Sequence, residues 1–182
     1  MVRSPEISLD QMNVKQKKVF EEITSGPRGS VRGPFIPLLN SPELADKVQK
    51  LGQFVRYECS IPWELREIAI LVTAYHWKAQ YEWFAHDAEA RRAGVSESII
   101  EAIRIGERPD FRSSDEEEIY DFCKELYETK GVSDSTFEKI IKRHGLQGAT
   151  DLSGLLGHYN LIAITLNIFD IEVPGGAKPL PT

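Results

Sequence analysis

The sequence predicts an all-α protein of about seven to eight helices, on three observations. Apolar residues recur at steps of three and four, strand-like alternation is rare, and segments rich in Ser, Gly or Pro separate the periodic stretches. The chain has 182 residues, of which 41% are hydrophobic, enough for one domain to bury a core. We expect a single domain over 1–182, comprising an N-terminal helix with a Gly/Pro/Arg loop (1–40), a helical core (41–170) and an extended tail (171–182).

The N-terminal forty residues predict one helix followed by irregular backbone. Ser8 followed by Gln11 resembles a capping box, and the apolar stripe after it predicts a helix that ends near Thr24. The segment SGPRGSVRGPFIPLLN, residues 25–40, holds three glycines and three prolines, so we expect a loop there.

The next two helices are expected to build the core. Ser41 and Pro42 predict the start of a helix that runs to about Glu58, with Leu44, Val48, Leu51 and Val55 as its apolar stripe. The helix that opens at Pro62 is apolar almost all round and should be central, with a break over 76–79.

Small residues also predict the boundaries of the remaining helices. They are expected over 80–92, from Ser96 to before Gly106, over 115–130 after a cap at Ser114, from Ser133 to His144, and over 151–169. The Pro- and Gly-rich tail should lie extended on a surface or on a neighbouring subunit.

Composition excludes several classes of function. The 28 acidic residues exceed the 22 basic ones, the net charge is -6, and no basic stripe is present, so we expect no nucleic-acid partner. No apolar run could span a bilayer and no signal peptide is recognised, which predicts a cytoplasmic protein without membrane association. Cys59 and Cys123 form neither a disulfide framework nor a Cys-x-x-Cys motif.

The densest cluster of chemically active residues is YHWKAQYEWFAH, residues 75–86. Glu82 and His86 are four apart, so on a helix the carboxylate could orient the imidazole. Glu67 lies among apolar neighbours on the preceding helix and needs a partner, for which His86 is the natural candidate. Glu67, Glu82 and His86 are therefore predicted as a catalytic acid/base set.

Each of these patterns also has a simpler interpretation. A Glu and a His four apart are common on helix surfaces, and the aromatic residues of 75–86 could be core or subunit-interface packing. A carboxylate/histidine metal site would need His76 or His158 as further ligands. The spacing does not match known metal-binding helices, so no metal is predicted.

Polar residues in two other segments are candidates for substrate binding. Arg28 and Arg32 in the loop could hold a substrate carboxylate, or be ordinary surface arginines. His158 and Tyr159 interrupt the apolar last helix, so they either line a cavity or are hydrogen-bonded core residues. His144 is expected to be stabilised by a helix C-terminus.

The stretch RGPFIPLLN…YEWFAH (32–86) and the later YNLIAITLNIFDIEVP (159–174) resemble the carboxymuconolactone decarboxylase and alkyl hydroperoxidase D superfamily. In its peroxidase branch a Glu is followed by Cys-x-x-Cys and a His, which here match Glu67, Ala79, Glu82 and His86. Both sulfurs are missing. The resemblance implies an all-α antiparallel bundle that assembles as trimers or hexamers, with the active site near a subunit boundary.

Without the two thiols, peroxidase chemistry is not expected, although the family contains peroxidases. The resemblance then implies a cofactor-free enzyme of acid/base type, which decarboxylates or transfers a proton on a small carboxylated lactone or unsaturated acid. His86 would donate the proton, oriented by Glu82 and tuned by Glu67. A noncatalytic oligomeric protein that binds a small ligand is the alternative. The residues predicted to bind substrate are Arg28, Arg32, Tyr75, His76, Trp83, His158 and Tyr159.

Overall fold

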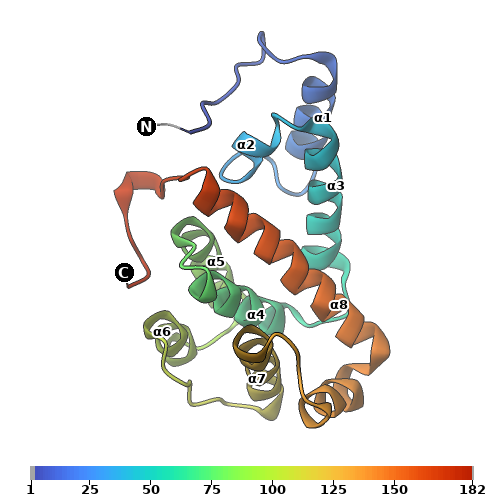
Figure 1. Cartoon of the computed structure of the whole chain (residues 1–182), viewed down its shortest axis with the longest axis vertical. Helices are drawn as coiled ribbons and strands as arrows, with labels where there is room; N and C mark the ends of the chain where they lie inside the picture. The colour runs from blue at the N-terminus through green and yellow to red at the C-terminus, as the bar shows by residue number, and fades with distance from the viewer. Residues whose placement is uncertain (1–2, 182) are drawn as a thin grey trace.

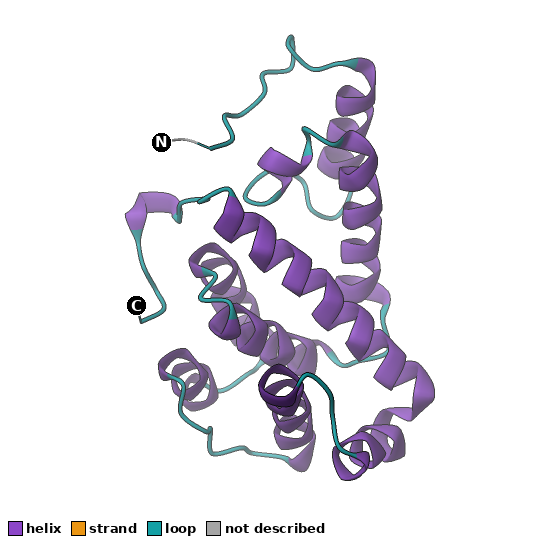
Figure 2. Cartoon of the chain, in the orientation of Figure 1, coloured by secondary structure: helices purple, strands orange, loops and turns teal. Residues whose placement is uncertain are grey.

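A computed structural model describes residues 3–181, and within that range every regular element is helical (Figures 1 and 2). The all-α prediction is confirmed. The elements are α1 (Val14–Ser25), α2 (Phe35–Leu38), α3 (Pro42–Gln53), the π-helix η1 (Phe54–Glu58), α4 (Trp63–His76), α5 (Gln80–Ala93), α6 (Glu97–Ile105), α7 (Ser114–Thr129), α8 (Asp134–Ile168) and the 3-10 turn η2 (Pro174–Gly176).

Helix α4 is the centre of the molecule, as its apolar sequence predicts. Its residues from Leu65 to Ala74 are buried except Arg66, and the helix packs against α5, α6, α7 and α8. A helix buried on all sides has no solvent face on which polar residues are free of cost. Glu67 and Thr73 are nevertheless buried in it, so each must find a partner.

The long helix α8 divides the structure into two apolar clusters. It runs diagonally between α1–α3 on one side and α4–α7 on the other (Figure 1). The larger cluster surrounds α4, and the smaller one packs Ile23, Phe35 and Val48 against Ile162 and other residues near the end of α8. The space between the two clusters is where a cavity can form.

The apolar stripe predicted for α3 is buried at only two of its four positions. Val48 and Val55 are buried as predicted, but Leu44 and Leu51 are each 43% exposed. The buried face is turned toward the small residues Ala45 and Gly52, where neighbouring elements approach closely. After Gln53 the backbone widens into the π-helix η1, so the predicted single helix to Glu58 is two helical segments.

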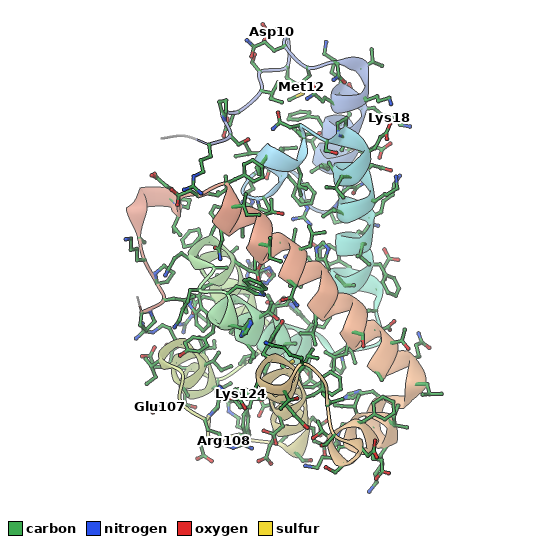
Figure 3. The ribbon with its side chains drawn as sticks, in the orientation of Figure 1. Asp10, Met12, Lys18, Glu107, Arg108 and Lys124 are labelled. Carbon is green, nitrogen blue, oxygen red and sulfur yellow. The ribbon has the colours of Figure 1, made fainter. Side chains whose placement is uncertain are left out.

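Two predicted helix starts were also misplaced. Helix α1 begins at Val14, because Asn13 makes the capping box with Gln16, whereas Ser8 only closes a turn with Gln11. Met12, which is labelled in Figure 3, lies just before that helix and is buried. Helix α7 is capped by Ser113, one residue before the predicted cap.

Two segments predicted as irregular contain helix. Residues 35–38 form the short helix α2, since Phe35 and Leu38 are apolar enough to be buried there. The predicted break at Gly145 is present: α8 comprises two helical segments that meet at this non-helical residue (φ 68°, ψ -178°), and the second segment begins at 146 instead of 151. A glycine permits this positive-φ, extended conformation, which interrupts the helical backbone and changes the direction of the chain.

The C-terminal tail packs on its own chain. The backbone N–H and carbonyl of Leu180 both hydrogen-bond the Gln80 side-chain amide, and Arg104 donates to the Pro179 carbonyl at 3.1 Å. Leu180 is almost completely buried. None of the helices in 3–181 is long and apolar enough to cross a membrane.

The loop 26–34 is held close to α5 by a glycine, which a substitution can test. Gly33 has φ of 58°, and a Cβ there would stand 2.5 Å from the Tyr81 ring, whereas Gly29 has φ of 70° with no atom within 4 Å. Gly29→Ala should cost only the left-handed conformation, about 1–2 kcal/mol. Gly33→Ala should also cost overpacking, a further 1–3 kcal/mol or so. Urea unfolding of both variants measures the difference, and equal losses would contradict this packing.

Candidate active site

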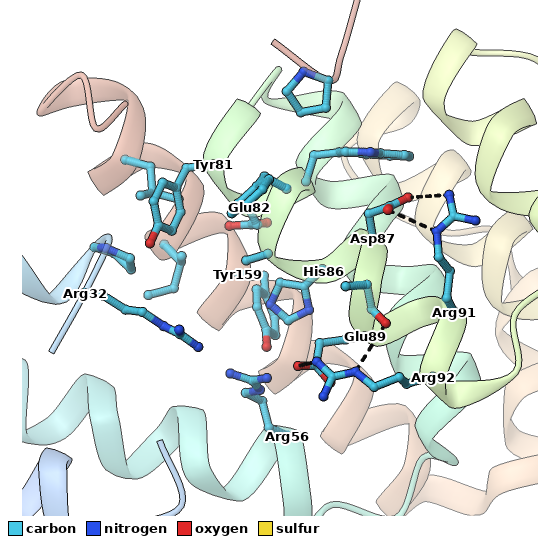
Figure 4. Close-up of a pocket in the computed structure, with 18 of the residues that line it drawn as sticks. Arg32, Arg56, Tyr81, Glu82, His86, Asp87, Glu89, Arg91, Arg92 and Tyr159 are labelled. Carbon is cyan, nitrogen blue, oxygen red and sulfur yellow. Dashed lines mark hydrogen bonds and ion pairs between the residues drawn. The ribbon is translucent and has the colours of Figure 1, made fainter. Parts of the chain in front are cut away.

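A cavity of about 820 Å³ lies between the two halves of the molecule. Its wall is formed by the loop around 27–34, η1, α5, α6, α8 and the tail, and Figure 4 shows many of the residues that line it. Its charged and aromatic lining residues include Arg28, Arg32, Arg56, Tyr81, Glu82, Trp83, His86, Asp87, Glu89, Arg91, Arg92, Glu101, Arg104, His158 and Tyr159.

The cavity wall contains a buried carboxylate–histidine pair. His86 Nδ1 lies 2.8 Å from Glu67 Oε2, and Trp63 Nε1 donates to the other carboxylate oxygen at 3.2 Å. Because a carboxylate only accepts, His86 Nδ1 carries the proton of this bond. His86 Nε2 makes no hydrogen bond to any residue in 3–181 and belongs to a cavity-lining side chain. The pair is arranged to exchange a proton at that nitrogen.

Glu82 does not orient His86 as predicted. Both of its carboxylate oxygens are buried and lack a hydrogen-bond partner among the described residues. The i,i+4 spacing brings the two residues onto one side of α5, but the imidazole is turned toward α4, where Glu67 holds it. Burial raises the pKa of the Glu82 carboxyl well above 4.5, which favours its neutral, proton-donating form.

His158 and Tyr159 of α8 line the cavity, which was the first of the two interpretations of these polar residues. Neither His158 Nδ1 nor the Tyr159 hydroxyl has a hydrogen-bond partner within the described part of the chain. Burial, with the charges of Arg28 and Arg56, lowers the pKa of His158 from 6.5 to about 3, so its ring is neutral at neutral pH. Tyr159 packs edge-on to His86, with ring centres 5.0 Å apart.

The six arginines of the cavity wall fall into two groups. Arg91, Arg92 and Arg104 form ion pairs with Asp87, Glu89 and Glu101 respectively. Arg28, Arg32 and Arg56 form no ion pair with any residue of 3–181. The unpaired group leaves a positive wall in a protein whose net charge is -6.

Two of the residues predicted to bind substrate lie outside the cavity. Tyr75 and His76 lie at the C-terminal end of α4 and are absent from the cavity lining. His76 is exposed and stacks on Tyr127, and Tyr75 packs against Gly106. The turn at 77–79 separates them from α5, so nearness in sequence to Glu82 did not place them beside it. Trp83, by contrast, is buried and lines the cavity.

Two residues of the site, Arg56 and Trp63, were not predicted from the sequence. Arg56 projects into the cavity from η1, and a π-helix turn is not recognisable from residue spacing. Trp63 stands four residues before Glu67, and this i,i+4 spacing on a predicted helix could have identified it as a partner.

The prediction for His144 was wrong. A favourable helix C-terminus would raise the pKa of its imidazole, whereas burial lowers that pKa.

Neither cysteine belongs to the site. Cys59 and Cys123 are buried free thiols, neither lines the cavity, and burial raises the pKa of Cys123. In the range 3–181 there is also no cluster of three or more His, Cys, Asp or Glu residues that could hold a metal ion.

The neutral state of Glu82 predicts a pH-dependent stability. Its folded-state pKa lies above the unfolded value of 4.5, so its contribution to folding is present at low pH and is lost as the pH rises through the folded pKa. The unfolding free energy of Glu82→Gln minus that of the wild type should therefore increase above pH 4.5 by about 1.4 kcal/mol per pH unit. Urea titrations between pH 4.5 and 8 measure it, and a constant difference would mean that Glu82 is ionised in the fold.

Comparison with known proteins supports the fold. No family model and no curated protein matches the sequence. The structure is similar to the crystal structure of an uncharacterized peroxidase-related protein from Ralstonia eutropha JMP134, described as an alkylhydroperoxidase AhpD core. The TM-score is 0.75, with 99% of this chain and 97% of that chain covered, at 15% sequence identity. The fold implied by the resemblance is confirmed: this chain has the fold of the alkylhydroperoxidase AhpD core.

Proposed function

We propose that this protein is a cofactor-free acid/base enzyme that acts on a small carboxylated lactone or unsaturated acid. The observation that carries the proposal is the buried Glu67–His86 pair, whose free Nε2 faces a cavity. A histidine held at Nδ1 by a carboxylate is suited to move protons at its other nitrogen. The size of the cavity suits a small organic ligand.

In the decarboxylating form of the reaction, the bond between the substrate carbon and its carboxylate breaks. The electron pair moves into the unsaturated carbonyl system and gives a dienolate and CO2. Protonated His86 donates its Nε2 proton to a carbon of the dienolate, and water restores that proton afterwards. The Glu67 carboxylate stabilises the imidazolium before the transfer.

The charges in the cavity support an anionic substrate. Arg28 or Arg32 would bind its carboxylate, because neither guanidinium is paired within 3–181. Glu82 would not repel that substrate, because burial favours its neutral form. Glu82 is thus a second proton donor at the site rather than a partner of His86.

We also propose that the chain self-associates in the cytoplasm as a homotrimer or homohexamer. Leu44, Leu51 and Phe54 support this, because these apolar side chains of α3 and η1 are 39–43% exposed. An exposed apolar group of this kind is typical of a contact surface. It lies on the elements that lead to Arg56 and so adjoins one wall of the cavity.

Replacement of His86 tests the proposal. With carboxymuconolactone and related carboxylated γ-lactones as substrates, His86→Ala should lower kcat by about 10²–10⁴-fold, since the proton donor is lost. His76→Ala is the matched control and should keep wild-type turnover, because His76 is exposed and outside the cavity. CO2 release and solvent deuterium incorporation measure the two steps.

Two results would contradict the proposal. Full turnover by His86→Ala would remove His86 from the mechanism. If the wild type neither releases CO2 nor exchanges carbon-bound hydrogen with any of these lactones, the enzyme proposal fails, and the noncatalytic binding protein becomes the better description of the cavity.

A thiol mechanism is the second candidate, favoured by the peroxidase-related protein that shares this fold. The doubly substituted variant Cys59→Ala, Cys123→Ala should keep lactone turnover, because both thiols are buried outside the cavity. It should also leave any organic hydroperoxide consumption unchanged. Loss of hydroperoxide consumption in a variant that folds normally would support the thiol mechanism instead.

A further inference from the structure

The Tyr159 hydroxyl is a hydrogen-bond donor without an acceptor. It is buried, and no residue of 3–181 accepts its proton or donates to it. The ring is held edge-on between His86 and His158, at centre distances of 5.0 and 5.1 Å. Burial raises the pKa of Tyr159, so the group remains an O–H donor at neutral pH. A buried polar group without a partner costs free energy unless a ligand provides one.

Two guanidinium groups stand beside this hydroxyl. Figure 4 shows the Tyr159 hydroxyl pointing toward Arg56, which forms no ion pair with another described residue. Arg28 stacks over the Phe35 ring at 4.3 Å. A Cβ at Gly52 would stand 3.3 Å from Arg28 Nη2 and 2.9 Å from His158, so the glycine makes room for both side chains.

The arrangement is electrostatically incomplete. Burial lowers the pKa of Arg28, and the like charges of Arg56 and Arg32 lower it further. The pKa of Arg56 is raised in spite of its burial, because Glu67 and Glu89 lie near enough to favour its charge without forming an ion pair with it. The other cavity arginines are neutralised by neighbouring carboxylates. Guanidinium groups that face one cavity without an ion-pair partner are stabilised by an anion that binds between them.

The proposed reaction indicates which anionic oxygen this is. A carboxylate that leaves as CO2 loses its charge, so two arginines bound to it would stabilise the ground state more than the transition state. The carbonyl oxygen of the conjugated system gains charge in the same step, and donors placed around it accelerate the reaction.

We propose that Tyr159, Arg28 and Arg56 form an oxyanion site that binds the enolate oxygen of a planar conjugated substrate, while His86 acts at the carbon end. This rests on the proposed acid/base function and specifies its substrate as an enolisable conjugated carbonyl compound. The edge-on contact of Tyr159 with His86, with ring centres 5.0 Å apart, puts the hydrogen-bond donor and the proton carrier within reach of one small ligand. Arg32, exposed on the cavity rim, is left to bind the substrate carboxylate.

Binding of 4-nitrophenol tests this site without any turnover, because its phenolate is a planar, delocalised oxyanion with its own visible absorption band. The wild type should bind the phenolate about tenfold or more tightly than the phenol, which lowers the apparent pKa of the bound probe by about one unit or more. Tyr159→Phe and Arg56→Gln should each weaken phenolate binding by about tenfold, since each loses a hydrogen bond to a charged oxygen. Absorbance titrations at several pH values measure both effects.

Matched controls separate the site from the cavity in general. Tyr81→Phe removes another cavity hydroxyl, and Arg91→Gln removes an arginine that is already paired with Asp87, so both should bind the phenolate as the wild type does. The inference is overturned if the wild type does not bind the probe, if it prefers the neutral phenol, or if Tyr159→Phe and Arg56→Gln bind like their controls. Phenolate binding by a protein that turns over no lactone would instead reject the proposed reaction and retain the oxyanion site.

Discussion

The hydrogen bond between Glu67 and His86 is the interaction on which the site depends. It joins the central helix α4 to α5 in a region where both side chains are buried. Loss of either partner would leave a buried polar group unsatisfied, so the two helices are held in one relative orientation. In that orientation His86 lines the cavity with its Nδ1 held by Glu67, and Glu82, on the same helix, has no hydrogen-bond partner among residues 3–181.

A second constraint is the distribution of charge around the cavity. Glu82 is kept neutral by burial, whereas Arg28, Arg32 and Arg56 are unpaired in the described chain. The cavity therefore combines a histidine oriented by a carboxylate with a positive wall, although the protein as a whole is acidic. A proton carrier close to unpaired positive charge suits the enolate chemistry that we propose.

A shared fold does not by itself determine the chemistry of a site. At the two positions where the resemblance expects the thiols, this chain has Ala79 at the start of α5 and Glu82 in its first turn. The glutamate replaces a nucleophile with a buried acid in the same cavity. One scaffold can hold unrelated reactions because the side chains of the site, and not the helix packing, decide the reaction.

Much of this protein follows from sequence alone. Local spacing determined the helices, the ends at Gly94 and Gly106, the central place of α4 and the three residues Glu67, Glu82 and His86, because periodicity and capping act within one element. Tertiary structure decided that Glu67 and not Glu82 holds His86, that Tyr75 and His76 lie outside the cavity, and that Arg56 and Tyr159 stand together in it. These are contacts between elements. They depend on the angles at which the helices cross and on which buried polar groups come within hydrogen-bonding distance of one another. Residue spacing within a single helix encodes neither.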